Sequence, residues 1–90
     1  MLALRENGRT EVRCRFGVVD VVTKSEAIEC KHYKSWKQAL GQALVYGEAV
    51  QKIPRVHLFG ETRLSQDKEE TIAKLGVRLS YHWDSRRNDI

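Results

Sequence analysis

Hydrophobic and polar residues alternate along the first third of the chain. In EVRCRF (residues 11–16) every second residue is apolar, which predicts a half-buried β-strand. VVDVVT (18–23) is rich in β-branched residues and predicts a second strand. AIECK (27–31) predicts a third strand, separated from the second by a short polar turn. The chain therefore begins with three consecutive strands.

The pattern then changes to a helical period. Between Ser35 and about Val50, apolar and small residues recur on one stripe, and Ser35 is a suitable N-cap. Pro54 separates this predicted helix from the apolar strand RVHLFG (55–60). The stripe consists of Trp36, Ala39, Leu40, Ala43, Leu44, Gly47 and Val50.

A second helix and a last strand complete the order. Asp67 followed by Glu70 forms a capping-box pattern that opens a short helix, which Gly76 ends. GVRLSYHW (76–83) alternates again and predicts a final strand, whereas the tail DSRRNDI (84–90) is expected to fray. The order βββαβαβ predicts one α/β domain over residues 1–90, an α+β mixed sheet with helices packed against it.

Composition sets broad limits on function. The 90 residues are 41% hydrophobic and 31% charged, as in soluble globular domains, and carry a net charge of +4 that leans towards anionic partners. No apolar run approaches the roughly 20 residues that span a bilayer. Because the start is too polar for a secretory signal, we expect a cytoplasmic protein without a membrane partner. Cys14 and Cys30 have no zinc-like spacing and are expected to be free thiols.

The hairpin of the second and third strands places two acids together. A turn over Lys24 and Ser25 puts Asp20 directly opposite Glu29, and Lys31 projects from the same face. Opposed like charges destabilise a sheet. Lys31 offsetting two acids on a solvated face is the ordinary explanation, but the neighbouring residues are mostly apolar. A retained proton on one acid, or bound Mg²⁺ or Mn²⁺, would resolve the repulsion.

These residues resemble the PD-(D/E)xK nuclease superfamily, whose core hairpin carries an Asp and then Glu-x-Lys. Asp20 and Glu29-Cys30-Lys31 match that motif, and Gln42 to Tyr46 matches the QxxxY helix motif of its RecB-like members. The resemblance covers about residues 11–60 and implies a restriction-endonuclease-like core. Val19 stands where the family has a proline, and the family's acid-bearing leading helix is missing, so that Glu11, Glu6 or a second subunit would replace it.

The resemblance implies a metal-dependent DNA endonuclease. Asp20, Glu29 and the backbone carbonyl of Cys30 would hold Mg²⁺ or Mn²⁺, with Glu11 as a further candidate ligand. The metal would activate a water for phosphodiester hydrolysis, Lys31 would assist that water, and Gln42 would hold a phosphate or nucleotide beside it.

Basic and aromatic residues supply candidate nucleic-acid contacts. The run KHYKSWK (31–37) joins a strand to a helix and combines phosphate-binding and base-stacking side chains. We interpret Trp36 as a helix anchor, and His57 and His82 as structural residues. For Tyr46 core packing is an equal alternative, and arginines on an outer strand face are usually only solubilising. The candidates are Lys34, Lys37, Arg13, Arg15, Tyr46 and His32.

Two other functions remain open on the sequence alone. A non-catalytic nucleic-acid-binding module with the same fold would explain the missing helix, although the intact acids and Lys31 count against it. A structural or protein-interaction domain would use the acids in an internal ion pair with Lys31. We expect DNA as the partner, without excluding RNA, and a homodimer or higher homo-oligomer.

Overall fold

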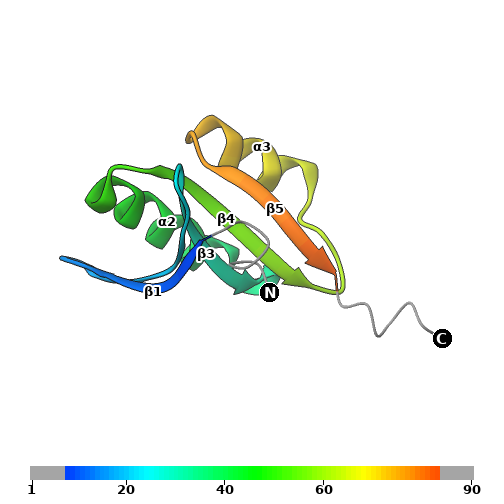
Figure 1. Ribbon diagram of the computed structural model, residues 1–90. Coiled ribbons are helices and arrows are strands. Elements are labelled where there is room, and N and C mark those ends of the chain that lie inside the picture. Colours follow the sequence, from blue (N-terminus) through cyan, green and yellow to red (C-terminus); the bar gives the residue numbers. More distant parts are fainter. Residues whose placement is uncertain (1–7, 84–90) are drawn as a thin grey trace.

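The computed structural model describes residues 8–83, and its elements follow the expected order of three strands, helix, strand, helix and strand (Figure 1). A short 3₁₀ helix, η1, is the one addition to that order within the described part of the chain. Glu6 and the tail 84–90 lie outside the described residues. The elements are β1 (Arg9–Cys14), β2 (Gly17–Val22), β3 (Glu26–His32), η1 (Tyr33–Ser35), α2 (Trp36–Val50), β4 (Ile53–Gly60), α3 (Gln66–Lys74) and β5 (Arg78–Trp83).

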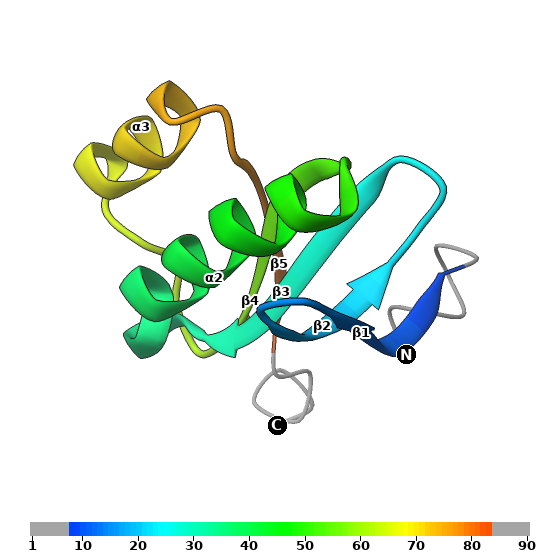
Figure 2. The ribbon, with the colours of Figure 1, turned by 90° about the vertical axis from the view of Figure 1, so that its left-hand side faces the viewer.

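The five strands form one mixed sheet in the order β1-β2-β3-β4-β5. β1, β2 and β3 pair antiparallel, whereas β3, β4 and β5 pair parallel, as βαβ connections require. α2 and α3 lie on one face of the sheet (Figure 2), and no helix within residues 8–83 is long and apolar enough to cross a membrane. The main core under them comprises Ala39, Ala43, Val56, Leu58, Leu64, Ile72 and Val77.

Small residues let α2 lie close to the sheet. Ala39, Ala43 and Gly47 recur every four residues and are the buried positions of the helix. A Cβ on Gly47 would stand 3.1 Å from the Lys52 carbonyl oxygen and 3.2 Å from Pro54 Cβ, so the glycine permits the contact with the start of β4. The helix begins after Ser35, as expected, although the Ser35 side chain makes no capping hydrogen bond.

Several predicted boundaries were wrong. β4 begins at Ile53, so Pro54 lies inside the strand, paired with Ala27, instead of preceding it. β1 ends at Cys14, and Arg15 and Phe16 form the two-residue turn to β2, so that Phe16 is 55% exposed instead of buried. The second helix begins earlier than the capping-box pattern indicated. Ser65 is its N-cap, accepting the Lys68 N–H at 3.4 Å, and Asp67 belongs to the first turn. Asp67 there still favours the positive end of the helix dipole.

β2 leaves the sheet at Asp20. The pairs Val21–Ile28 and Val22–Ala27 confirm the predicted register, but the ladder between β2 and β3 ends there. The alternation of faces also shifts: Val22 and Val19 both pack on the helix-covered side, and Val21 between them packs on the other side. The β1–β2 hairpin beyond Asp20 therefore projects from the body of the domain (Figure 1).

Arginines and a buried acid hold the other face of the sheet. The Glu26 carboxylate accepts hydrogen bonds from Arg55 Nη1 at 2.9 Å and Arg78 Nη1 at 2.8 Å, so that β3, β4 and β5 are tied together. Burial alone would raise the pKa of Glu26, but the two arginines outweigh it and lower that pKa. Ser80 accepts from Arg55 Nε at 2.9 Å and lies 2.6 Å from His57 Nδ1. His57 is thus structural, as expected.

Gly17 provides a stability test of the hairpin. Its φ is +148°, and an added Cβ would stand 2.5 Å from the Tyr46 hydroxyl. We expect Gly17→Ala to lower the free energy of unfolding by about 2–3 kcal/mol, through backbone strain and overpacking. Gly41→Ala is the matched control, because nothing lies within 4 Å of its added Cβ and alanine favours a helix by up to about 1 kcal/mol. Urea unfolding measures both; equal stability of the two variants would contradict the packing of Tyr46 on Gly17.

Candidate functional site

The acid pair occupies the point where β2 and β3 separate. The Asp20 N–H donates to Glu29 Oε2 at 3.1 Å, and the Cys30 N–H donates to Asp20 Oδ2 at 2.9 Å. Each carboxylate thus satisfies a backbone N–H of the opposite strand where the ladder no longer does so. The structure brings Asp20 and Glu29 together as the sequence predicted.

Burial controls the charge of this pair. Glu29 is 2% exposed, and burial together with the nearby Asp20 charge raises the pKa of its carboxyl to about 7, against the opposing effect of its hydrogen bond from Asp20 N–H and of Lys31. Burial likewise raises the pKa of the Cys30 thiol to about 11, so the thiol stays protonated at neutral pH. Both cysteines are free, as expected. The pair therefore holds a proton near neutral pH unless another cation replaces it.

Other predicted site residues join the pair only in part. Lys31 is half-buried, and its charge acts on Glu29. Gln42 Oε1 is buried and has no hydrogen-bond partner, and within residues 8–83 no hydrogen bond joins the Gln42 side chain to either acid. Glu11 is exposed with a left-handed φ of +51°. Among residues 8–83, no cluster of three or more His, Cys, Asp or Glu side chains is arranged to hold a metal.

Tyr46 and Trp36 have packing roles. Tyr46 packs with Val19 under the β1–β2 hairpin, and its hydroxyl lies against Gly17. Trp36 packs on the main core, with Lys68 Nζ 5.7 Å from the centroid of its ring. Core packing therefore accounts for the aromatic residue of the QxxxY pattern, and the interpretation of Trp36 as a helix anchor is confirmed.

An aromatic row crosses the three parallel strands on the face that the helices leave open. His32, Phe59 and His82 are successive ladder partners on β3, β4 and β5, and we call these three residues the aromatic row. The rings of His32 and Phe59 are 5.7 Å apart, and Tyr33 lies 4.5 Å from His32. Phe59 is 44% exposed. The sequence analysis singled out His32 but not Phe59, and it interpreted His82, which is exposed on β5, as structural.

The row owes its shape to Gly60 and to the start of η1. A Cβ on Gly60, whose φ is +134°, would stand 2.6 Å from Tyr33 Cδ1 and 2.9 Å from His32 Nε2, so glycine leaves room for both rings. His32 Nδ1 accepts the Lys34 N–H at 3.2 Å, and its Nε2 lies 3.2 Å from Glu61 Oε2. The imidazole is thereby held at the carboxyl end of β3.

The basic residues predicted to contact nucleic acid lie in two separate places. Lys34 and Lys37 are exposed and follow β3 directly, so they lie at the same end of the parallel strands as the aromatic row. Arg13 and Arg15 are exposed on the β1–β2 hairpin instead. The predicted nucleic-acid contacts therefore divide between the strand ends and the hairpin.

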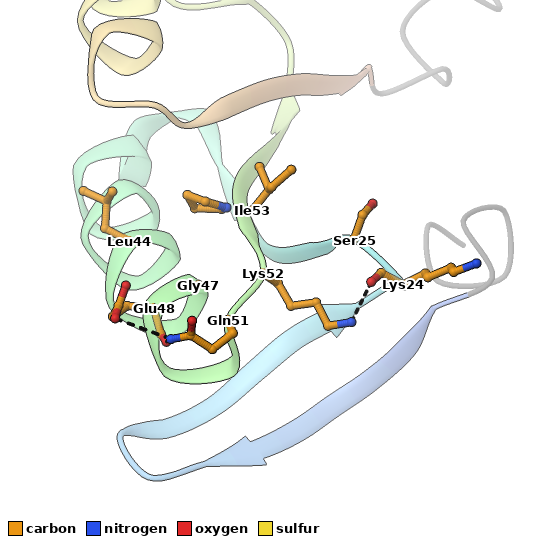
Figure 3. Close-up of a pocket in the computed structure, with 9 residues that line it drawn as sticks. Lys24, Ser25, Leu44, Gly47, Glu48, Gln51, Lys52 and Ile53 are labelled. Atoms are coloured by element: carbon orange, nitrogen blue, oxygen red, sulfur yellow. Dashed lines mark hydrogen bonds between the residues drawn. The ribbon is translucent and has the colours of Figure 1, made fainter.

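A hollow between the β2–β3 turn and the carboxyl end of α2 contains none of the predicted site residues (Figure 3). Lys24, Leu44, Lys52 and Ile53 are among its lining residues. Lys52 Nζ donates to the Lys24 carbonyl at 2.6 Å and so ties the two loops together. The hollow lies at the carboxyl end of α2, whereas Lys37 lies at the amino end of that helix.

Comparison with known proteins finds relatives but no family model and no solved structure that matches. The chain is 53% identical over 49 residues to the putative KilA-N domain-containing protein L32 of Acanthamoeba polyphaga mimivirus. It is 39% identical over 59 residues to the putative KilA-N domain-containing protein R878 of the same virus. The matches cover 52% and 62% of this chain, but only 13% and 17% of the relatives.

These relatives correct the assignment to the PD-(D/E)xK nucleases and the prediction of a Mg²⁺-dependent endonuclease. Both relatives carry the name of a different domain, and the restriction-endonuclease-like core that the resemblance implied is not confirmed. The motif has local structural explanations: Asp20 and Glu29 satisfy backbone N–H groups where the strands separate, and Tyr46 supports Gly17. The short motif was therefore not sufficient evidence for catalysis.

Glu29 predicts a pH-dependent stability. Its folded pKa of about 7 exceeds the ordinary value of 4.5, so between these values the folded state binds more protons than the unfolded state. The contribution of Glu29 to stability is therefore greatest below pH 4.5 and falls by about 3 kcal/mol as pH rises to 7. Glu29→Gln should remove this loss. The free energy of unfolding of the variant should therefore rise relative to that of the native protein as pH increases from 4.5 to 7.

Urea unfolding of both proteins over this pH range measures the difference between them, which cancels the titration of other groups. Glu70→Gln, at an exposed position of α3, is the matched control and should show no such trend. A difference between Glu29→Gln and the native protein that does not change with pH would contradict the raised pKa.

Proposed function

We propose that this chain is a non-catalytic nucleic-acid-binding module, with DNA as its main partner. The observation that carries the proposal is the aromatic row of His32, Phe59 and His82, which adjoins a basic strand end. The relatives support it, because KilA-N domains are DNA-binding domains and the proposal needs no catalytic group. The chain spans less than a fifth of each relative, so the activity of a longer protein is a separate matter.

The spacing of the strands and the exposure of Phe59 suit the row to unpaired bases. Ladder partners on neighbouring strands lie about 4.8 Å apart, so the row offers successive platforms across the sheet. Phe59 is exposed at the centre of the row, with histidine rings on either side. Base–aromatic stacking contributes about 1–3 kcal/mol per base and tolerates any sequence.

Two lysines provide candidate contacts to the phosphate backbone of a bound DNA strand. Lys34 and Lys37 extend from the loop and helix that follow β3, where no ion pair within residues 8–83 occupies either ammonium group. Each is therefore available to a phosphate, with release of counterions on binding. The resulting mode is single-strand binding with little sequence preference.

The first test compares Phe59→Ala with Lys37→Gln. We expect Phe59→Ala to weaken single-stranded DNA binding about tenfold at any salt concentration, because stacking is lost. Lys37→Gln should instead lower the salt slope of binding by about 0.7, because one phosphate contact is lost. Fluorescence anisotropy against a labelled single strand measures both effects.

Lys74→Gln is the matched control for charge. Lys74 is exposed in the last turn of α3, away from the carboxyl ends of the parallel strands. No binding of any nucleic acid by the native protein at low salt would overturn the proposed function. If Phe59→Ala bound single-stranded DNA as tightly as the native protein, the aromatic row would not be part of the binding surface.

We also propose that the acid pair binds a divalent cation without catalysis. Two carboxylates held side by side provide the hard oxygen donors that Mg²⁺ and Mn²⁺ prefer, and these ions are often held by only one or two carboxylates. The Cys30 carbonyl would be a third oxygen. A bound cation would replace the proton of Glu29 and remove the repulsion from Asp20.

Thermal unfolding tests the cation. Mn²⁺ or Mg²⁺ should raise the Tm of the native protein, more at pH 8 than at pH 6 because the ion competes with the Glu29 proton, and EDTA should reverse the increase. Asp20→Asn keeps the size of the side chain and should lose the increase. The same Tm increase in Asp20→Asn would contradict the site. The homo-oligomeric state stays a prediction, which sedimentation would test.

A further inference from the structure

We propose that the β1–β2 hairpin is a second nucleic-acid contact that enters the major groove of duplex DNA. This inference rests on the proposed function and adds to it a surface for paired DNA, distinct from the aromatic row. It is based on the shape of the hairpin, its support from α2 and the charges on its outer face.

Beyond Asp20 the hairpin no longer pairs with β3 and projects as a two-stranded ribbon (Figure 1). Beyond Glu11 it consists of the pairs Val12–Val19, Arg13–Val18 and Cys14–Gly17, closed by the turn at Arg15 and Phe16. Three pairs extend about 10 Å. The major groove of DNA is about 8.5 Å deep and about 12 Å wide, and it admits such a ribbon.

One face of the ribbon is held from behind. Val12, Cys14 and Val19 pack with Tyr46 and Val50 of α2. This support extends nearly to the tip, because the Tyr46 hydroxyl lies against Gly17. The hairpin is thereby preorganised, so little conformational entropy is lost when it binds.

The other face and the tip carry the chemistry for DNA. Arg13, Arg15, Phe16 and Val18 are exposed, and within residues 8–83 no carboxylate pairs with either arginine. The Arg15 guanidinium carbon lies 4.7 Å from the centroid of the Phe16 ring, which orients it at the tip. Arginine donates two hydrogen bonds to a guanine edge, and apolar groups contact thymine methyls.

The requirement for a wide major groove distinguishes duplex DNA from duplex RNA and from a single strand. The major groove of an A-form RNA duplex is deep and too narrow for side chains to read. A single strand has no groove. The hairpin should therefore favour duplex DNA over both, whereas the aromatic row should favour single strands.

The experiment measures the affinity of the native protein and the Arg13→Gln/Arg15→Gln variant for three probes: a DNA duplex, an RNA duplex of the same sequence and one DNA strand. The variant should bind duplex DNA at least tenfold more weakly, because two arginine contacts to base edges are lost. Its affinity for the single strand should change less than twofold.

Lys24→Gln/Lys74→Gln is the matched control, because it removes the same charge from exposed positions outside the hairpin. It should retain most of the duplex affinity, and circular dichroism checks that both variants fold. Equal losses of duplex affinity in the two variants would overturn the inference, as would an equal loss on the single strand.

The two proposals fail in different ways. Absence of binding to all three probes by the native protein would overturn the proposed function and this inference together. Native binding to duplex DNA that the Arg13→Gln/Arg15→Gln variant retains would overturn the hairpin contact alone. In that case Phe59→Ala still tests the aromatic row on the single strand.

Discussion

The domain depends on how the backbone is satisfied where β2 departs from β3. At Asp20 the sheet loses a row of hydrogen bonds, and an unpaired buried N–H costs as much as a lost hydrogen bond. The two carboxylates replace the missing partners, each accepting from the opposite strand. The cost of burying Glu29 beside Asp20 is lowered when Glu29 keeps its proton. Departure of the hairpin and the raised pKa are thus two results of one constraint.

That departure separates the surfaces of the molecule. If β2 had continued beside β3, the hairpin would have extended the sheet, with Arg13 on its edge strand and Arg15 in the turn that closes it. Instead the ribbon bends onto α2, where Tyr46 and Val50 support it. The free half of β3 then ends at His32, which continues with Phe59 and His82 across the parallel strands. Ribbon and row present different chemistry, guanidinium groups on one and aromatic rings on the other.

Local patterns predicted the fold well because each element carries its own period. The β-branched residues around Asp20 and the small-residue stripe of α2 produced strands and helix close to the expected bounds. The register of β2 and β3 followed from the turn at Lys24 and Ser25, which the hydrogen bond from Thr23 N–H to the Glu26 carbonyl closes. The shift of faces at Asp20 was not predictable, since strict alternation is assumed when a strand is read from sequence.

The site was harder to predict than the fold, because it depends on neighbours that are distant in the sequence. Phe59 and His82 became part of one row only when parallel pairing set them beside His32, and nothing local marks them. The acids were found correctly, but their chemistry was inferred from spacing alone. Spacing constrains where side chains lie and leaves open why they are there: the same Asp and Glu serve a backbone that has lost its ladder. An unfavourable charge pair in a sheet is therefore evidence of a constraint, and the hydrogen bonds of its carboxylates show which constraint it meets.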